Sequence, residues 1–424
     1  MTRTPTVKLR LYLALTAVGA IAALATGHVA LIAVVAPFGA FVAVGVALAH
    51  EPNVAVSARL SRERLLEGDE FTVTVNLDRI ADVGLLELEL HPPVDLGLSG
   101  DAPRTLLLHP GETRELSFKL RADRWGGYRT GILTCRGWDR LGLIEYQLPA
   151  LTLPAVRVFP AAGKLRAMVD PLELHATAGS RVARELAEGI EFAEVRPFRP
   201  GDRLRRINWR VSARRGTPYV SDRHPERNAD VILFLDTFTD VGEARAGTLA
   251  FAVRAAAALA SSYLARKDRV GVIGFGGVLH GLGPRLGTAQ LYRILDALIT
   301  SEVVLSYAQK RVAFVPRRLL PAKALVIAIT PLIDERSIGA LLDLRARGFD
   351  LVVLDVSPVP TVAAGDTPAA ALAYRLWLLR RRALQARFEQ LGATVSEWRT
   401  EQPLELAVAS TVSFRRRTRH PTAA

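Results

Sequence analysis

An uncharged apolar stretch from Leu11 to Ala49 constrains this sequence more than any other feature. One membrane-spanning helix needs about 20 apolar residues, so the stretch has room for two. Gly27 and His28 lie near its middle, where a helix breaker and a polar ring predict a tight turn between a shorter first helix and a longer second one. We therefore expect residues 1–52 to form a transmembrane helical hairpin in a multi-pass protein of the cell membrane.

Basic residues flank both ends of this stretch and are absent from the expected turn. Because cytoplasmic flanks carry an excess of Lys and Arg, this distribution predicts that both ends, and the soluble domains that follow, lie in the cytoplasm. The flanking residues are Arg3, Lys8, Arg10, Arg59, Arg62 and Arg64. The alternative is a cleaved signal peptide with residues 11–26 as its apolar core, in which case the second apolar run remains as a span.

Downstream of the hairpin, the hydrophobic pattern changes twice. Residues 53–160 contain short segments in which apolar and polar residues alternate, which predicts an antiparallel β-sandwich. Residues 161–229 form a charged connector with less regular periodicity. In residues 230–414, apolar strands alternate with amphipathic helices, which indicates a doubly wound α/β domain with a mostly parallel sheet. Residues 415–424 form a basic tail that either lies against anionic lipid or is solvated.

The composition narrows the class of partner. The 424 residues include 55 Lys and Arg against 42 Asp and Glu, a net charge of +13, which favours anionic lipid, nucleic acid or an acidic protein surface. Cys135 is the one cysteine in the sequence. That count excludes an intramolecular disulfide and a cysteine-ligated metal cluster, so we interpret Cys135 as a small buried residue.

The connector contains a long spaced motif, GIEFAEVRPFRPGDRLRRINWRVSARRG. This motif resembles the hallmark of the DUF58 family, approximately G-x-E-F-x-x-x-R-x-[YF]-x-x-G-D-x-x-R-x-I-x-W-x-x-S-A-R. The matching residues are Gly189, Glu191, Phe192, Arg196, Phe198, Gly201, Asp202, Arg206, Ile207, Trp209, Ser212, Ala213 and Arg214. The resemblance implies a paired N-terminal span, a β-sandwich and a von Willebrand factor A-like domain. It also implies a role as partner or adaptor of a MoxR-type AAA+ ATPase, in a family whose biochemical activity is poorly defined.

A von Willebrand factor A-like domain typically carries a metal site with the motif D-x-S-x-S, a Thr from a second loop and an Asp from a third. Here Asp236 is in place, but Phe238 and Asp240 stand where the two hydroxyls belong. Thr288 matches the second-loop Thr, whereas Thr330 and Pro331 occupy the position of the third-loop Asp, and Asp334 lies three residues beyond. Since Mg²⁺ needs near-octahedral oxygen ligands, we expect no bound Mg²⁺ and no other cofactor, and we interpret Asp236, Asp240 and Thr288 as a vestigial metal rim. The alternative is a rearranged Mg²⁺ site, in which Asp240 adds a carboxylate and Asp334 substitutes for the third-loop Asp if the loop curls back.

The hallmark segment is strongly basic, with ten arginines against five acidic residues between positions 189 and 227. The guanidinium group suits pairing with carboxylates and phosphates, which predicts an anionic partner surface at Arg203, Arg205, Arg210 and Arg215. The competing interpretation is internal: Glu191, Glu194 and Asp202 neutralise Arg196, Arg206 or Arg214, while Phe192, Ile207 and Trp209 pack on the α/β domain. No nucleic-acid motif accompanies the charge, so we expect no nucleic-acid partner.

No sequence pattern for catalysis is present: there is no H-E-x-x-H, Walker A or G-x-S-x-G motif. The glycine-rich GFGGVLHG segment departs from G-x-G-x-x-G at Leu279 and predicts a hairpin turn instead. We therefore expect a non-enzymatic membrane scaffold or adaptor that docks the ATPase, an unidentified client protein, or both. The alternatives are a metal-dependent hydrolase that uses Asp236, Asp240 and Asp334, and a cell-envelope assembly factor that works without an ATPase.

Overall fold

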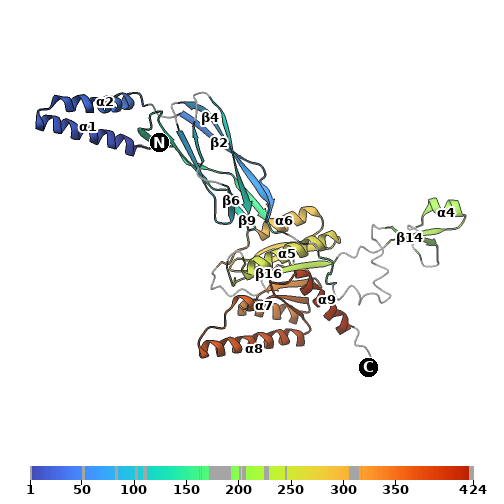
Figure 1. The fold of residues 1–424 in the computed structure, drawn as a ribbon. Coiled ribbons are helices and arrows are strands. Elements are labelled where there is room, and N and C mark those ends of the chain that lie inside the picture. Colours follow the sequence, from blue (N-terminus) through green and yellow to red (C-terminus); the bar gives the residue numbers. More distant parts are fainter. Residues whose placement is uncertain are drawn as a thin grey trace. The chain divides into compact units, whose positions relative to one another are not determined.

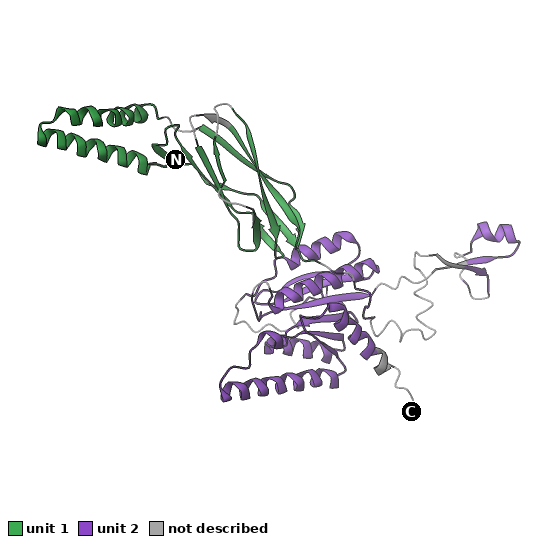
Figure 2. Ribbon diagram, viewed as in Figure 1, with its two compact units in different colours: residues 1–161 green, residues 162–424 purple. Residues whose placement is uncertain are grey.

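The computed structural model describes residues 2–49, 53–81, 85–100, 104–107, 112–161, 163, 165–170, 192–199, 202, 207–223, 229–243, 246–304, 315–316 and 318–419. The chain divides into two compact units, residues 1–161 and residues 162–424 (Figure 2).

Two apolar helices, α1 (Val7–Thr26) and α2 (Val29–Ala47), follow a short N-terminal strand in the first unit (Figure 1). Both are long and apolar enough to span a membrane, with mean hydropathies of 1.7 and 2.5, and most of their surface is exposed. Gly27 ends α1 in the left-handed conformation at φ 71°, which glycine adopts without strain. The turn is therefore where we expected it, but α1 has 20 residues and α2 has 19. The first helix is not the shorter one, because it also includes the basic residues at positions 8 and 10.

The two helices pack through small residues. A side chain at Gly19 would collide with Val35, and a Cβ at Gly39 would lie 3.0 Å from the Thr16 side chain. Close approach at glycine is the usual way in which membrane helices gain packing contacts.

The rest of the first unit consists of β-strands, which form several sheets that are almost entirely antiparallel. One sheet has the order β1-β11-β10-β5-β7 with β12 beside β10, the second β2-β4-β8-β6, and the third β3-β13-β9. The strands are β1 (Thr2–Pro5), β2 (Asn53–Leu60), β3 (Arg64–Leu66), β4 (Glu70–Ala81), β5 (Leu85–His91), β6 (Leu96–Ser99), β7 (Arg104–Leu107), β8 (Arg114–Ala122), β9 (Gly126–Arg129), β10 (Ile132–Trp138), β11 (Ile144–Gln147), β12 (Leu151–Thr152) and β13 (Ala155–Phe159).

Alternate side chains of these strands meet in one core. Val73 and Val75 of β4, Leu88 of β5 and Phe118 of β8 are almost completely buried and belong to the same apolar cluster. This is the result that the two-residue period predicts, since one face of each strand turns inward. Cys135 lies in the same cluster, and burial raises the pKa of its thiol to about 11.

The first residues of the chain, before the apolar helix α1, belong to a β-sheet. β1 pairs with β11 along its whole length. Beside this pair, Thr6 donates a hydrogen bond to the Leu143 carbonyl at 2.9 Å, and Lys8 Nζ donates to the Leu141 carbonyl at 2.8 Å. Leu9 of α1 and Val42 of α2 join Leu143 in a small apolar cluster. The ends of both apolar helices are therefore held against the β-structure of their own unit.

The second unit is built on a six-stranded sheet with the order β18-β17-β16-β19-β20-β21. The strands are β16 (Asp230–Thr237), β17 (Arg269–Gly276), β18 (His280–Arg285), β19 (Leu325–Thr330), β20 (Asp350–Val356) and β21 (Thr394–Trp398). All pairings are parallel except that of β17 with β18, which forms the hairpin expected from the glycine-rich segment. The order reverses at β16, as in a doubly wound α/β sheet.

Helices cover both faces of this sheet (Figure 1). They are α5 (Thr248–Ala265), α6 (Thr288–Leu298), α7 (Glu335–Ala346), α8 (Pro368–Gln390) and α9 (Leu404–Arg419). α5 packs on the four central strands of the sheet, and Leu344 of α7 and Phe388 of α8 share a core with Phe234. α5 is long and apolar enough to span a membrane, but 67% of its 18 residues are buried in the fold, as expected of a core helix.

The C-terminal basic segment corrects one expectation. We predicted a tail from residue 415, but α9 continues to Arg419. Arg415 is buried and forms an ion pair with Asp350 at 2.7 Å. Arg415 is therefore not accessible to lipid, because its guanidinium is neutralised by Asp350 at the start of β20.

Candidate functional site

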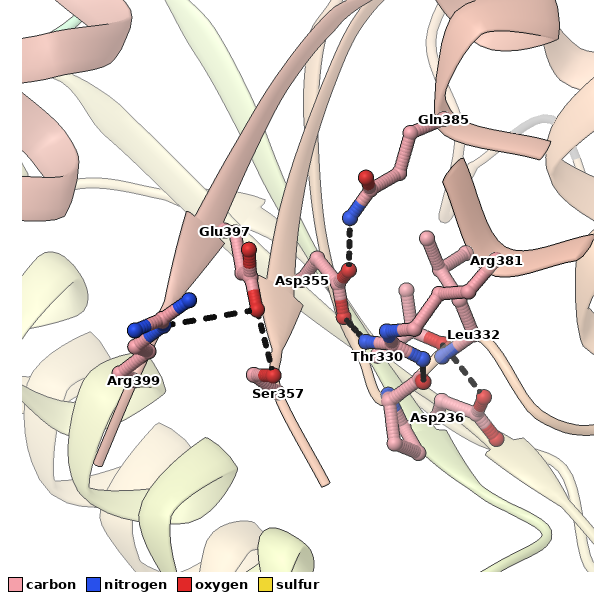
Figure 3. Close-up of polar contacts among 10 residues, drawn as sticks. Asp236, Thr330, Leu332, Asp355, Ser357, Arg381, Gln385, Glu397 and Arg399 are labelled. Atoms are coloured by element: carbon pink, nitrogen blue, oxygen red, sulfur yellow. Dashed lines mark hydrogen bonds and ion pairs between the residues drawn. The ribbon is translucent and has the colours of Figure 1, made fainter. Parts of the chain in front are cut away.

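The carboxyl edge of the α/β sheet is the expected place for a site, because the connections from the adjacent strands β16 and β19 leave in opposite directions there. Acidic and hydroxyl residues lie at or near the carboxyl ends of neighbouring strands, among them Asp236 in β16, Thr330 in β19, Asp355 in β20 and Glu397 in β21 (Figure 3).

Asp236 is 1% exposed and is held on both oxygens. Its Oδ2 accepts a hydrogen bond from Thr330 Oγ1 at 2.7 Å, and its Oδ1 accepts one from the Phe238 amide at 3.1 Å. Burial raises the pKa of Asp236, against the lowering effect of the Thr330 hydroxyl. Asp236 thus joins the loops after β16 and β19 from inside the fold.

The loop after β19 has an unusual backbone. Leu332 has a positive φ of 52°, which is rare for a bulky side chain and is stabilised only by its surroundings. The Leu332 amide donates to Thr330 Oγ1 at 3.0 Å, and the Pro331 carbonyl accepts from Arg381 at 2.6 Å. The Thr330 hydroxyl therefore accepts a hydrogen bond from Leu332 and donates one to Asp236.

Asp334 is committed to α7 and to an arginine. Its side chain caps the helix by accepting from the Arg336 amide at 2.9 Å, and it binds the guanidinium of the same residue at 2.9 and 2.8 Å. The hydrogen bond from Arg336 lowers the pKa of Asp334. The guanidinium also lies 4.0 Å from the ring centroid of Phe238. A fixed cation thus stands beside this edge of the sheet.

Asp355 forms a buried ion pair with Arg381 of α8, and Gln385 donates to its second oxygen at 2.7 Å (Figure 3). Burial raises the pKa of Asp355 to about 7, while Arg381 lowers it. Arg381 also reaches the Pro331 carbonyl. The pair therefore fixes the loop after β19 to β20 and α8.

The structure separates the residues that we grouped as a vestigial metal rim. Asp240 accepts hydrogen bonds from the Leu249 amide at 2.8 Å and the Thr248 hydroxyl at 3.2 Å, so it caps the N-terminus of α5. Thr288 begins α6, three residues after Arg285, and Arg285 pairs with the amino end of β17. Thr288 therefore lies at the opposite edge of the sheet from Asp236. The error arose because an antiparallel strand precedes α6 and returns the chain to that edge.

These residues do not fit a metal ion. In the described parts of the chain, no group of three or more His, Cys, Asp or Glu residues is close enough to hold one. Asp236 and Asp334 use their oxygens for the contacts above, and Arg336 already supplies a positive charge. The Ser337 hydroxyl is completely buried beside Asp236 and lowers the pKa of that carboxyl, but one hydroxyl does not complete a coordination shell.

A small cavity lies beside Thr237 at the same edge. Its volume is about 70 Å³, and its lining includes His280 and, just after α6, Thr300 and Ser301. A cavity of this size accommodates a few water molecules. Thr300 and Ser301 are the hydroxyl residues that α6 brings to this edge, and the sequence did not single them out.

The hallmark segment folds locally as a hairpin of β14 (Phe192–Pro197) and β15 (Tyr219–Arg223), with α4 (Trp209–Arg215) between them. Arg196 in β14 binds both oxygens of Asp202 at 2.8 Å. This contact confirms that Arg196 is paired internally. Several predicted residues lie outside the described part of the chain: Gly189, Glu191, Gly201, Arg203, Arg205, Arg206 and the side chains of Phe192 and Glu194.

Asn208 and Ser212 stabilise the turns on either side of α4. The Asn208 side chain caps the helix by accepting from the Val211 amide at 3.2 Å. Ser212 Oγ donates to the Asn208 carbonyl and accepts from the Tyr219 amide, both at 2.8 Å. Gly216 ends the helix at φ 70°. Ser212 therefore has a structural role, and the capping role of Asn208 was missed because Asn208 falls at an unspecified position of the motif.

The other side of α4 is exposed. Trp209 is 71% exposed, which is unusual for a tryptophan, and Arg210, Ala213 and Arg214 are exposed beside it. Trp209 and Ala213, like Arg210 and Arg214, are four residues apart and share a helix face. Arg215 is exposed as predicted, and its guanidinium lies over the Tyr219 ring at 5.1 Å. Among the described residues, Trp209 is therefore not enclosed by the fold, and Arg210 is exposed as predicted.

Comparisons with known proteins give limited matches. The chain is similar to a FixG-related protein from Vibrio parahaemolyticus, with 17% identity, a TM-score of 0.17, and coverage of 24% of this chain and 95% of that one. It is also similar to a non-cellulosomal cohesin from Archaeoglobus fulgidus, with 13% identity, a TM-score of 0.17, and coverage of 30% and 99%. Neither likeness is close enough to carry an argument.

A relative in Bacillus subtilis (strain 168), the uncharacterized protein YeaD, is 26% identical over 192 residues, which are 43% of this chain and 48% of YeaD. The chain thus aligns with about half the length of this relative. Residues 194–357, from β14 to just beyond β20, match the model of the family described as "Protein of unknown function DUF58".

Proposed function

We propose that this protein is a membrane-anchored, non-enzymatic adaptor whose α4 face binds a partner protein. The partner that the DUF58 resemblance favours is a MoxR-like AAA+ ATPase, with an unidentified client as the protein on which the pair acts. The observation that carries this proposal is the exposed Trp209 beside Arg210 and Arg214 on a short, capped helix.

Tryptophan and arginine dominate the binding energy of protein interfaces. An exposed tryptophan leaves a large apolar area in contact with water, so burial of this area by a partner is favourable. The two arginines add bidentate recognition of carboxylates, which favours an acidic partner surface. The α4 face therefore has both the apolar anchor and the charged rim that such an interface needs.

The base of this face is preorganised. The Arg196–Asp202 pair and the Ser212 hydrogen bonds fix the two ends of the α4 segment to the β14-β15 hairpin. Little conformational entropy is then lost from α4 when a partner binds, and a small entropy loss favours higher affinity.

The membrane topology is proposed from the first unit. Pairing of β1 with β11 keeps the residues before α1 beside the β-structure that follows α2. If both helices cross the bilayer, this pairing requires that the N-terminus and the β-sheets lie on one side. The basic flanks support the cytoplasmic side for both, and hence a multi-pass cell-membrane location.

We also propose that the α/β unit is a von Willebrand factor A-like domain that works without a metal ion. Its strand order and its acidic carboxyl edge support the assignment. The helix caps and ion pairs made by Asp240 and Asp334 favour a binding role over the hydrolase that we considered, because both carboxylates are already engaged.

The test is purification of the full chain in detergent with nucleotide present, followed by quantitative mass spectrometry. Trp209→Ala and the pair Arg210→Glu with Arg214→Glu are compared with wild type. Loss of an interface anchor costs about 2 kcal/mol or more, which weakens the affinity for the ATPase by at least about 30-fold. We therefore expect the α4 variants to recover much less ATPase than wild type. Tyr292→Ala is the matched control, since Tyr292 is an aromatic residue 49% exposed on α6.

Wild-type protein that captures no AAA+ ATPase would remove this partner from the proposal. Equal loss of the ATPase in Tyr292→Ala would show that α4 is not the specific contact. Retention of the ATPase by all α4 variants would leave the binding surface wrong even if the partner is right.

A further inference from the structure

The long helix α8 carries an apolar stripe on its outer face. Leu372, Leu376 and Leu379 are 59%, 52% and 59% exposed, and Ala383 and Ala386 extend the same exposed row. The spacing of four, three, four and three residues places all five on one side of the helix. Three leucines at half exposure or more in one row are unusual on a water-soluble surface.

The inner face of α8 is already used by the fold. Arg381 is buried in its contacts with Asp355 and Pro331, and Phe388 is completely buried in the core beneath the sheet. The orientation of the helix is therefore fixed, and the leucine row is not available to the protein core.

Exposed arginines border the apolar stripe on both sides. Arg375 and Arg382 are seven residues apart on one side, and Arg380 and Arg387 are seven residues apart on the other. Glu389 is the one acidic residue within the helix. Apolar residues between two rows of long cationic side chains are typical of helices that lie in the plane of a membrane interface, because the guanidinium groups reach the headgroups while the leucines enter the acyl boundary.

We propose that the outer face of α8 docks on an anionic lipid surface. The charge pattern favours lipid phosphate over a neutral surface, since each arginine near an anionic leaflet improves partitioning on the order of fivefold. The inference rests on the membrane anchoring proposed above, because a tethered chain presents α8 to a bilayer at high effective concentration. Docking attaches the α/β unit to the bilayer at a second point, separate from α1 and α2.

The experiment uses the full chain in lipid nanodiscs, with a nitroxide label on Leu376→Cys. Native Cys135 is 2% exposed and its thiol pKa is raised to about 11, so labelling near neutral pH is selective. Discs of phosphatidylcholine alone are compared with discs that also contain phosphatidylglycerol. Accessibility of the label to oxygen and to a water-soluble nickel chelate is read by power-saturation spectroscopy. The control label is on Leu286→Cys, a residue 44% exposed in the same unit but outside α8.

We expect the label at position 376 to become oxygen-accessible and nickel-protected in the anionic discs alone, while the label at 286 stays nickel-accessible in both. Replacing Arg375 and Arg382 with Gln lowers the docking equilibrium roughly 30-fold, as the loss of two cations requires. A chain that inserts into neither disc type contradicts the proposed anchoring, whereas an inserted chain without protection at position 376 contradicts α8 docking alone. Trp209→Ala leaves docking unchanged. Nickel access at 376 that is equal in both disc types overturns the proposal. Protection of position 376 from nickel that is equal in both disc types, or that is also present in detergent without lipid, identifies a protein contact and overturns the proposal too.

Discussion

Replacing Arg381 with Met is the sharpest test of how the carboxyl edge of the α/β sheet is held together. The substitution keeps most of the apolar volume of the side chain, but it removes the charge that faces Asp355 and the donor that reaches the Pro331 carbonyl. Asp355 is 0% exposed, so water does not replace the lost partner.

The size of the effect follows from two terms. A buried carbonyl left without its donor costs about 1–3 kcal/mol, and a buried charge that loses its partner brings the total to about 3–5 kcal/mol. The second term depends on pH because Asp355 can take up a proton. Burial raises its pKa to about 7 even with Arg381 present, and without Arg381 the pKa rises further.

The raised pKa of Asp355 makes the folded state more stable at low pH. In both proteins the folded state binds a proton that the unfolded state has lost, so stability falls as the pH rises from about 4 to 7. Above pH 7 the wild type has finished this loss, whereas the variant continues to lose about 1.4 kcal/mol per pH unit. The difference between the two is therefore about 2–3 kcal/mol near pH 6.5 and larger by about 1.4 kcal/mol at pH 8.

Hydrogen exchange measured by mass spectrometry on peptides from β19 and β20 gives the opening free energy of this unit at each pH. Arg380→Met, at an exposed neighbour on the same helix, is the control and should change it by less than about 0.5 kcal/mol. Adding Asp355→Leu to Arg381→Met should restore part of the loss, because no buried charge remains. A penalty below about 1 kcal/mol, or one that does not grow between pH 7 and 8, would refute the reasoning.

Three smaller effects follow from the hairpin and the helix caps. The hydrogen bonds from Arg196 hold the pKa of Asp202 at about 2 against 3.8 for the free side chain, so the pair stabilises the fold above pH 3.8 and this contribution is lost as the pH falls to 2; a carboxyl NMR titration with a midpoint near 3.8 would disprove the pairing. Asp240→Ala removes the α5 cap and should lower the free energy of unfolding by about 1 kcal/mol, whereas Thr288→Ala should lower it by less than about 0.5 kcal/mol. A thermal unfolding experiment in which Thr288→Ala is the more destabilised variant would contradict the assignment. Ser212→Ala leaves the Tyr219 amide without its acceptor and should cost about 1–3 kcal/mol, visible as faster amide exchange in β15; unchanged exchange there would count against it.

Much of the architecture was predictable because it follows from local hydrophobic periods. The uncharged stretch gave the two apolar helices and their Gly27 turn, and alternation of period two gave the β-strands of the first unit. Fully apolar runs such as residues 231–235 predicted the parallel strands, which are buried on both faces. Each of these patterns reports which side of a single element faces water, and that information is present in a short window of sequence.

The candidate site was predicted less well because its residues come from separate elements. Asp236 was identified from the metal-site motif that the von Willebrand factor A resemblance implies, but its partner Thr330 is 94 positions away. Thr288 was grouped with Asp236 by motif spacing, although the antiparallel β18 places it at the other edge. The burial of Arg381 and Arg415 was not predicted, since an arginine that pairs with a distant aspartate looks the same in sequence as one that is solvated.

The sequence by itself determined where the apolar helices, the β-strands and the α/β alternation lie, because burial of one face imposes a period on each element. Tertiary structure alone decided which charges are free. Arg415 and Arg381 lie in arginine-rich segments, yet both are neutralised inside the fold by Asp350 and Asp355, while Trp209, an apolar residue, is left on the surface. The physical reason is that an ion pair or an exposed face depends on which strands and helices become neighbours, and neighbours are fixed only when the sheet order is formed.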